Sequence, residues 1–477
     1  MSAMGYADLV FSMGSIHAAI VELKVDESIN EHGKMSIKVL LDKSKCENIL
    51  YESVDVCTVL YFDKNELNVL FSGFITYFNI DTEGDVYYLT IDVQTATYMI
   101  GIERRNCIYQ NENMNASEII SRVLERSSHS KSILNLPKAK LKEILVQYEE
   151  TDWEFIKRVA SIQGYSIIVD SMKSEVRVQI NSYILQQDIN WDELPYSIKI
   201  DREKYSKNIV NTVNKDNYIN QTYYTSYTVE STDIIALGSK LIFHGMELIV
   251  GNIERVIKQG ILMNIYNLYF EEGIKVSRKY NDMLKGSSIN GEVVNVQRNQ
   301  VQVAFNIHDE NDGILHWFPF STVMASNDGS GWHCMPKIGE QIRIFFPVAD
   351  ENRAYAITNI EGYNPINKSK SDPMGDPNLK NITTPAGNSV SFIENGISLS
   401  TSGEKSAVVL TNDGKINLTG TEKISIYAGK RIQIKGKKLD ISADTKLSIN
   451  SDTGSSVTIN AGNIELSGIM INQNIQQ

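Results

Sequence analysis

The stretch "KINLTGTEKISIYAGKRIQIKGKKLDISADTKLSIN" (residues 415–450) repeats one pattern: an apolar residue, any residue and a second apolar residue. The first members of successive triplets lie eight, eight, seven and eight residues apart. The apolar members are Ile416, Leu418, Ile424, Ile426, Ile432, Ile434, Leu439, Ile441, Leu447 and Ile449. In a strand, the two apolar residues point to one side and the middle residue to the other. The pattern therefore predicts short strands with one dry face and one wet face.

A three-residue strand buries too little surface to be stable alone, so the dry faces must stack on further copies. A single chain could coil into a solenoid with three eight-residue faces per turn. Alternatively, three chains could wrap into a triangular prism filled with Ile, Leu and Val. We favour the trimer, because it leaves no long open strand edge and the segment offers no capping helix. Residues 386–477 are thus predicted to form a trimeric β-helix, or β-prism.

Length and composition point to a soluble protein of several domains. A chain of 477 residues exceeds one ordinary core, and its contents of 42% hydrophobic and 22% charged residues are typical of globular proteins. The net charge of -12 argues against nucleic acid as the main partner. The apolar stretch "LVFSMGSIHAAIV" (residues 9–21) lacks a basic leader. We therefore expect synthesis in the cytoplasm without a signal peptide.

The residues that usually bind metals are dispersed. The four cysteines show no CxxC spacing, and the seven histidines form neither HExxH nor HxH. We therefore expect no metal site, no disulfide framework and no cofactor.

Changes in periodicity divide the remainder of the chain. Alternating apolar residues between about Tyr6 and Val93 predict half-buried antiparallel strands, and a second block of this kind begins near Ser197. Five short strands with unequal loops after Ser288 suit an OB-type barrel. We expect a mainly β chain with a first β-barrel (1–100), an α/β insertion (101–196), a second β-barrel (197–285), an OB-type five-stranded barrel (286–362), a neck or linker (363–385) and the repetitive β-helix (386–477).

Two helices are predicted in the insertion. In "NASEIISRVLERS" (115–127), Ser117 is a plausible cap, and one face gathers Ile119, Ile120, Val123 and Leu124. In "TDWEFIKRVASIQG" (151–164), Thr151 and Glu154 form a capping box, and Gly164 ends the helix. The buried face of this second helix is predicted to contain Trp153, Ile156, Val159 and Ala160.

The same stretch carries the strongest candidate for catalysis. Its four carboxylates are Glu149, Glu150, Asp152 and Glu154. A glycosidase could use such a group as acid and nucleophile. Capping and the helix dipole also favour Asp and Glu in a first helical turn, and we favour this structural interpretation.

A second candidate site lies in the small barrel. "LHWFPF" and "GWHCMP" bring His316, His333 and Cys334 together if the strands pair as expected. A Cys/His nucleophilic pair needs a third orienting group, which the spacing does not supply. Aromatic packing is the favoured interpretation.

The repeat region is locally basic. Between Lys415 and Lys446 there are eight basic and three acidic residues. One interpretation of these basic residues is that they bind a membrane or another anion. Lys and Arg on the outer turns of a solvated rod are the commoner case, and we favour it.

Taken in order, these segments resemble the VgrG-type spike proteins of type VI secretion and other contractile injection systems. The likeness rests on "YEETDWEFIKRVASIQGY" (148–165), "GWHCMPKIGEQIRIFF" (331–346) and "DENRAYAITNI" (350–360). The first is similar to the family's acidic, aromatic helix, and the others to its barrel strand and final turn. Lys337 stands where the family often has Arg, and Ala354 where Pro is usual.

The resemblance implies a structural protein rather than an enzyme: a homotrimeric hub and needle that is ejected and crosses a target membrane only transiently. It also implies baseplate and inner-tube proteins, a PAAR-type tip protein and effectors as partners. The eight-residue rhythm breaks at the last triplet, so we expect the tip protein to contact Ile469, Met470, Ile471 and Asn472. The alternatives are a tail-associated peptidoglycan hydrolase using the acidic cluster and a glycan-binding adhesin.

Overall fold

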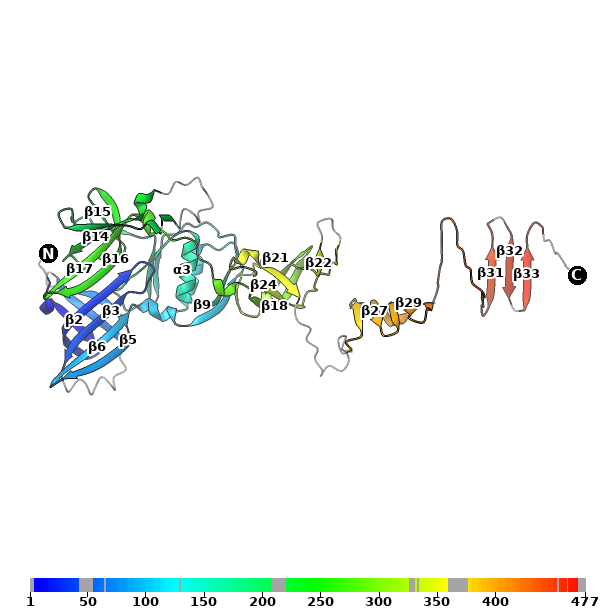
Figure 1. The fold of residues 1–477 in the computed structure, drawn as a ribbon, viewed down its shortest axis with the longest axis horizontal. Helices are drawn as coiled ribbons and strands as arrows, with labels where there is room; N and C mark the ends of the chain where they lie inside the picture. The colour runs from blue at the N-terminus through cyan, green and yellow to red at the C-terminus, as the bar shows by residue number, and fades with distance from the viewer. Residues whose placement is uncertain are drawn as a thin grey trace. The chain divides into compact units, whose positions relative to one another are not determined.

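The chain divides into two compact units, Met1–Ile360 and Glu361–Gln477, which are described separately. The computed structural model describes residues 4–42, 55–63, 66–127, 130–203, 205–206, 220–325, 331–332, 334–358, 376–452, 454–460 and 462–470 (Figure 1). His333, Ile471 and Asn472, three of the predicted site residues, lie outside these ranges.

The first unit begins with a closed six-stranded barrel. Its strands are β1 (Leu9–Met13), β2 (Ile16–Ser28), β3 (Lys34–Leu41), β4 (Val56–Asp63), β5 (Glu66–Glu83) and β6 (Val86–Gln94). They pair in the order β1-β4-β5-β6-β3-β2, and β1 also pairs with β2, which closes the ring. Alternate residues point inward, and Phe11, Val39 and Phe71 are fully buried. The predicted first barrel is confirmed.

The second block of strands continues this sheet. It contains β12 (Ile184–Leu185), β13 (Tyr196–Ile200), β14 (Thr225–Ser231), β15 (Ser239–Phe243), β16 (Met246–Lys258) and β17 (Ile261–Tyr269). The first residues of β16 pair with β15, whereas Asn252–Val256 pair with β2 of the barrel. Within the described residues the block closes no ring of its own, which differs from the separate second barrel that we expected. Among the described residues, the outermost strands β12 and β13 pair only with β15 and β14, and not with each other.

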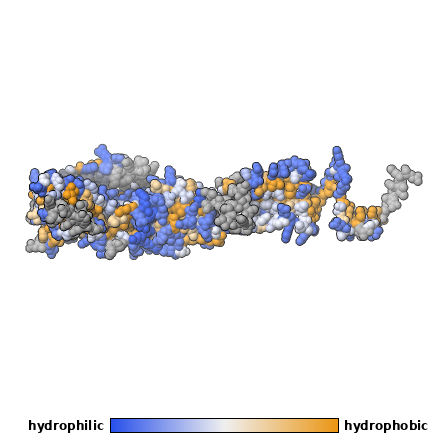
Figure 2. Space-filling view, turned by 90° about the horizontal axis from the view of Figure 1, so that it is seen from below, coloured by the Kyte–Doolittle hydropathy of each residue, from blue (hydrophilic) through white to orange (hydrophobic). Residues whose placement is uncertain are grey.

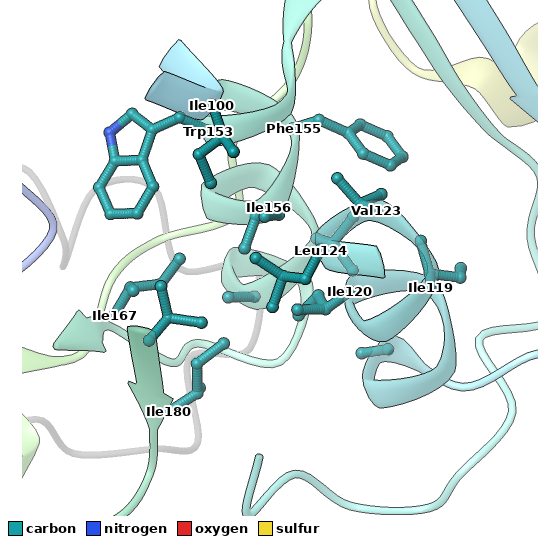
Figure 3. Close-up of a cluster of buried hydrophobic side chains, with 14 of the residues drawn as sticks. Ile100, Ile119, Ile120, Val123, Leu124, Trp153, Phe155, Ile156, Ile167 and Ile180 are labelled. Atoms are coloured by element: carbon teal, nitrogen blue, oxygen red, sulfur yellow. The ribbon is translucent and has the colours of Figure 1, made fainter. Parts of the chain in front are cut away.

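Between these blocks lies the α/β insertion. Its elements are β7 (Arg104–Tyr109), α2 (Ala116–Glu125), β8 (Lys131–Leu134), β9 (Leu145–Thr151), α3 (Asp152–Ile162), β10 (Ile167–Val169) and β11 (Arg177–Ile180). The predicted apolar faces of both helices meet in one core (Figure 3). The cap of α2 is Asn115 rather than Ser117, because the Asn115 side chain accepts from the amide of Glu118. Gly164 has the left-handed conformation predicted for it, with φ +80°.

A small barrel ends the first unit. Its elements are β18 (Ser288–Gln297), β19 (Gln300–Phe305), β20 (His308–Glu310), β21 (Phe318–Pro319), β22 (Met324–Ala325), β23 (Gly331–Trp332), β24 (Gln341–Phe345) and β25 (Tyr355–Thr358). Five of them form a sheet in the order β21-β19-β18-β24-β25, and a parallel bridge between Phe320 and Ala356 joins its ends. Strand β20 leaves the barrel and pairs in parallel with β7. The barrel is thereby attached to the insertion.

Short helical turns complete this unit and recur in the next. They are η1 (Tyr6–Asp8), η2 (Ala96–Gly101), η3 (Gln221–Tyr224), α5 (Glu271–Ile274), η4 (Asp282–Leu284), η5 (Glu351–Arg353) and η6 (Ser402–Glu404). No helix in the described part of the chain has the length and apolarity needed to span a membrane.

The second unit contains two antiparallel sheets. The first consists of β26 (Lys380–Thr383), β27 (Ser389–Ile393), β28 (Gly396–Ser400), β29 (Ser406–Thr411) and β30 (Ile416–Gly420), and the second of β31 (Lys446–Asn450), β32 (Ser456–Asn460) and β33 (Asn463–Ser467). The whole stretch 421–445 is described, and it contains no strand. The triplets therefore form strands only at the two ends of the repeat, where each strand pairs with its neighbour in the same chain.

Candidate functional site

The acidic cluster lies where β9 ends and α3 begins. Thr151 is the N-cap of α3, and its Oγ1 accepts a hydrogen bond from the Glu154 amide at 3.2 Å. In return, Glu154 Oε2 accepts from the Thr151 amide at 3.0 Å. The predicted capping box is confirmed, and it gives Glu154 a structural role.

Glu150 and Asp152 are buried, with 7% and 5% of their surface exposed. Arg158 Nε and Nη2 donate to the Glu150 carboxylate at 3.0 and 2.9 Å. Asp152 accepts from Arg126 Nη1 at 2.9 Å and from Gln147 Nε2 at 2.8 Å. The expectation that all four carboxylates are capping or surface residues is wrong for these two. Cationic and amide side chains of the same insertion surround them and offset the loss of hydration.

The electrostatic balance at Glu150 reflects this burial. Loss of hydration raises the pKa of the Glu150 carboxyl, while the charge of Arg158 opposes the shift. Burial favours a protonated acid, but both carboxylate oxygens already accept from the same guanidinium. The arrangement therefore suits a structural ion pair.

Glu149 has an unusual backbone conformation. Its φ is +46°, a left-handed value that non-glycine residues adopt infrequently. Asn106 stabilises it through two hydrogen bonds: Asn106 Nδ2 donates to Glu149 Oε1 at 2.7 Å, and the Glu149 amide donates to Asn106 Oδ1 at 2.8 Å. The pairing of β7 with β9 shifts register between Arg105 and Cys107, beside this contact.

The guanidinium of Arg158 joins two segments that are far apart in the sequence. Its Nη1 donates to Glu351 Oε1 at 2.5 Å, across 193 residues, and its Nη2 donates to the Val146 carbonyl at 2.8 Å. The side chains of Arg158 and Glu351 are only 3% and 1% exposed. This buried triad of Glu150, Arg158 and Glu351 links the insertion to the turn before β25. This triad was not predicted from the sequence, although a cationic side chain on the buried side of a helix signals a buried carboxylate partner.

Three of the four carboxylates line one cavity of about 490 Å³: Glu149, Glu150 and Glu154. Arg104, Lys157 and Lys279 supply cations to the same walls. A glycosidase needs one acidic and one ionised carboxyl on either side of the scissile bond. Here each carboxylate has a partner within the fold, in Asn106, Arg158 or the cap of α3. The geometry matches structural hydrogen bonds and ion pairs better than a catalytic pair of carboxyl groups.

The histidine of the second candidate site packs against an aromatic ring. The rings of His316 and Phe318 lie 4.6 Å apart and nearly perpendicular. His316 Nδ1 also contacts Glu112 Oε1, an acidic partner that the sequence analysis missed. The favoured interpretation of aromatic packing is confirmed for His316. Cys334 is exposed, so the structure does not place it in the core of the barrel.

The apolar triplets are exposed in the single chain. Pairing in the first sheet of the second unit puts Ile416 opposite Leu410 and Leu418 opposite Val408, so their side chains share one face. In the stretch 421–445, more than half of each of the six predicted core side chains is exposed: Ile424, Ile426, Ile432, Ile434, Leu439 and Ile441. Figure 2 shows apolar atoms on the surface of this unit. At the predicted tip, Ile469 is fully exposed and Met470 is 78% exposed.

Across the described residues, no group of three His, Cys, Asp or Glu side chains could hold a metal ion.

A family model for the Alg8 N-terminal domain matches residues 57–188. This stretch begins inside β4 of the first barrel and ends after β12. It contains the listed elements of the α/β insertion but covers less than half of the chain. No curated protein matches the sequence.

Solved structures match over most of the chain. A Francisella PdpA–VgrG complex, described as half-lidded, is 11% identical, with coverage of 86% of this chain and 87% of that one and a TM-score of 0.52. A lidless PdpA–VgrG complex gives 11% identity, coverages of 86% and 97% and a TM-score of 0.54. The E. coli c3393 protein is described as a component of the type VI secretion system, similar in structure to T4 bacteriophage tail proteins gp27 and gp5. It gives 12% identity, coverages of 72% and 98% and a TM-score of 0.51. The chain therefore shares its fold with the VgrG-type spike proteins.

Proposed function

We propose that this protein is a structural spike, the hub and needle of a contractile injection apparatus. Three copies would assemble, dock on baseplate and inner-tube proteins, and be ejected through a target envelope with a tip protein or effectors. The shared fold supports a tail or baseplate role. In this proposal the small five-stranded barrel is an OB-type module between hub and needle.

The proposal rests mainly on the stretch 421–445, which contains no strand and leaves its apolar side chains exposed. No backbone-to-backbone hydrogen bond in residues 376–452 involves residues 422–445. A row of exposed isoleucines is unfavourable in water, and the backbone amides and carbonyls of this stretch have no backbone partner within residues 376–452. Full burial of one such side chain stabilises by about 1.5–3 kcal/mol. Two further copies of the same repeat would supply both strand partners and a dry interior.

The strand pattern also favours three chains over the single-chain solenoid. A solenoid stacks successive triplets of one chain, and its core is therefore complete without a partner. Here the triplets between β30 and β31 remain exposed in the single chain. The described strands on either side run antiparallel to their neighbours, as in a meander.

Light scattering tests the assembly. The purified protein should have three times the chain mass of 53.7 kDa at micromolar concentration and should keep that mass in mild denaturant. A stable monomer that withstands the same denaturant would favour the solenoid and contradict the spike.

We propose that the protein is not an enzyme. The alternative function is that of a peptidoglycan hydrolase. The cavity lined by Glu149 and Glu154 is the feature that favours this alternative. A zymogram on cell walls separates the two functions. A cleared band that disappears in Glu149→Gln, with the trimer intact, would overturn the non-enzymatic proposal.

The tip protein can be tested by truncation. Ile469 and Met470 are the last described residues and lie just beyond β33 (Asn463–Ser467). Both are exposed, and exposed apolar residues beside an edge strand favour a cover. Deleting Gly468–Gln477 should abolish capture of a PAAR-type protein in pull-downs and leave the trimer assembled. Equal capture by the truncated and full-length proteins would place the docking site elsewhere.

A further inference from the structure

We infer that the basic part of the needle, residues 415–446, binds the headgroups of anionic phospholipids, in place of the solvated rod that the sequence alone favours. This segment, called here the basic stretch, has a local excess of five positive charges in a chain whose net charge is -12. Residues 376–414 contain two basic and four acidic residues, and residues 447–477 contain no basic and two acidic residues. Within residues 376–477, a net positive charge is thus found only in the basic stretch.

Few of these cations are neutralised within the chain. Lys415 pairs with Asp413 at 2.6 Å and Lys438 with Asp440 at 2.7 Å. In the continuously described range 376–452, the other six make no ion pair: Lys423, Lys430, Arg431, Lys435, Lys437 and Lys446. All six are exposed. An unpaired, exposed cation is available to a negatively charged surface.

The cations lie on the side of the repeat that stays wet in the proposed trimer. In β31, Lys446 pairs across from Asn460 and its neighbour Leu447 from Ile459, so the cation and the apolar residue occupy opposite faces. By the same alternation, Lys423, Arg431 and Lys435 each flank an apolar triplet on its polar side. Assembly through the dry faces would therefore leave these charges outward.

An aromatic residue favours a lipid surface over a soluble polyanion. Tyr427 is the only aromatic residue after Phe392, and it lies in the middle of the basic stretch. Its side chain is 92% exposed. Tyrosine is enriched where proteins meet the headgroup layer of a membrane, and clustered Lys and Arg bind anionic lipids there. A solvated rod gains nothing from an exposed tyrosine at this point.

Vesicle binding tests the inference. The full-length protein should sediment with vesicles of phosphatidylcholine and phosphatidylglycerol, and not with phosphatidylcholine alone. High salt should abolish binding, because it screens exposed charges. Changing Lys430, Arg431, Lys435 and Lys437 to Gln should weaken binding at least about tenfold. A control with the same loss of charge elsewhere should stay within about twofold: Lys138→Gln, Lys173→Gln, Lys380→Gln and Lys405→Gln.

Tyr427→Ser distinguishes the lipid from other polyanions. It should weaken binding to the anionic vesicles by about threefold and leave binding to heparin, a soluble polyanion, unchanged. Equal loss in the two quadruple variants, or tighter binding to heparin than to vesicles, would overturn the inference. The outward direction of the cations rests on the proposed trimer. Light scattering on the same samples therefore separates failure of the trimer from failure of lipid binding.

Discussion

The first barrel and the repeat of the second unit use the same alternation of apolar and polar residues, with opposite results. In the barrel, Phe11, Val39 and Phe71 are completely buried, because β1 pairs with β2 and closes the ring within one chain. In the repeat, Ile416 and Ile426 are 69% and 68% exposed. Alternation therefore predicts a dry face, but strand length and connection decide whether the same chain can cover it.

Strand length explains the contrast. The barrel contains strands such as β2 and β5, of 13 and 18 residues, which bend around a core and pair along both edges. The triplets of the repeat recur every seven or eight residues and leave no room for such strands. Long strands can complete a core alone, whereas short ones need copies. Ile432→Asp and its control Gln433→Asp test the repeat, whereas the other substitutions below test the first unit, whose core is completed within one chain.

The largest effect is expected from Ile432→Asp in the repeat. In the trimer it would place three carboxylates in one dry interior, and each buried unpaired charge costs several kcal/mol or remains neutral through a raised pKa. The trimer should dissociate, as measured by light scattering. Gln433→Asp, on the wet face of the same triplet, is the matched control and should leave the mass unchanged. Equal dissociation by both variants would show that the faces are assigned wrongly.

The next effect concerns the buried triad of the first unit. Arg158→Met would leave Glu150 and Glu351 buried without their cation, which should lower the free energy of unfolding by about 3–5 kcal/mol. Urea denaturation followed by tryptophan fluorescence measures this change. Arg353→Met, an exposed arginine two residues beyond Glu351, should stay within about 0.5 kcal/mol.

A second variant separates lost charge balance from lost packing. Adding Glu150→Gln and Glu351→Gln to Arg158→Met removes the unpaired charges and should restore most of the stability. If the triple variant is less stable than Arg158→Met alone, the triad does not act as a compensated ion cluster.

A smaller, pH-dependent effect is expected at His32. Burial, with help from Lys157 and Lys34, lowers the pKa of His32 from 6.5 to about 4. Its ring lies 4.6 Å from Trp153, and its Nδ1 contacts Thr97 Oγ1 at 2.8 Å. Between these pH values the unfolded chain binds a proton that the folded chain does not. The stabilisation is therefore complete above pH 6.5 and is lost as pH falls toward 4, by up to about 3 kcal/mol.

Denaturation at pH 7.5 and 4.5 measures this loss. In His32→Gln the difference between the two pH values should shrink by most of that amount, because the variant has no imidazole to protonate. An unchanged difference would assign the acid sensitivity to other groups.

The smallest effect is expected from Glu154→Gln. Glutamine can still accept from the Thr151 amide, so the unfolding free energy should change by less than about 0.5 kcal/mol. Glu154→Ala removes the acceptor and should cost about 1 kcal/mol. Equal losses in both variants would argue against the capping role.

Local signals made the barrel strands and the helices predictable from the sequence. The apolar faces of α2 and α3 follow from helical spacing, and the capping box at Thr151 follows from its partner three residues later. The same rule identifies Asn115 as the cap of α2, because Glu118 lies three residues beyond it. The prediction of Ser117 as the cap of α2 did not take the position of Glu118 into account.

Contacts between distant segments could not be predicted in this way. The pair Arg158–Glu351 spans 193 residues, and neither side chain reveals its partner through spacing. The pairing of β16 with β2 likewise depends on how two blocks meet, so the alternation of the second block did not show that it continues the sheet of the first barrel. The periodicity of a sequence predicts which face of a helix or strand is apolar. It does not predict which distant segment packs against that face, as in the Arg158–Glu351 and β16–β2 contacts.

Amide hydrogen exchange across residues 422–445 tests the central claim most directly. The single chain provides no backbone-to-backbone hydrogen bond for this stretch among residues 376–452. If three chains pair here, these amides should exchange as slowly as those of β29 (Ser406–Thr411), which pairs within its own chain on both sides. Slow exchange in the trimer and fast exchange in Ile432→Asp would agree with the account. Fast exchange throughout 422–445 in the intact protein would contradict it, because no partner chain would then cover the repeat.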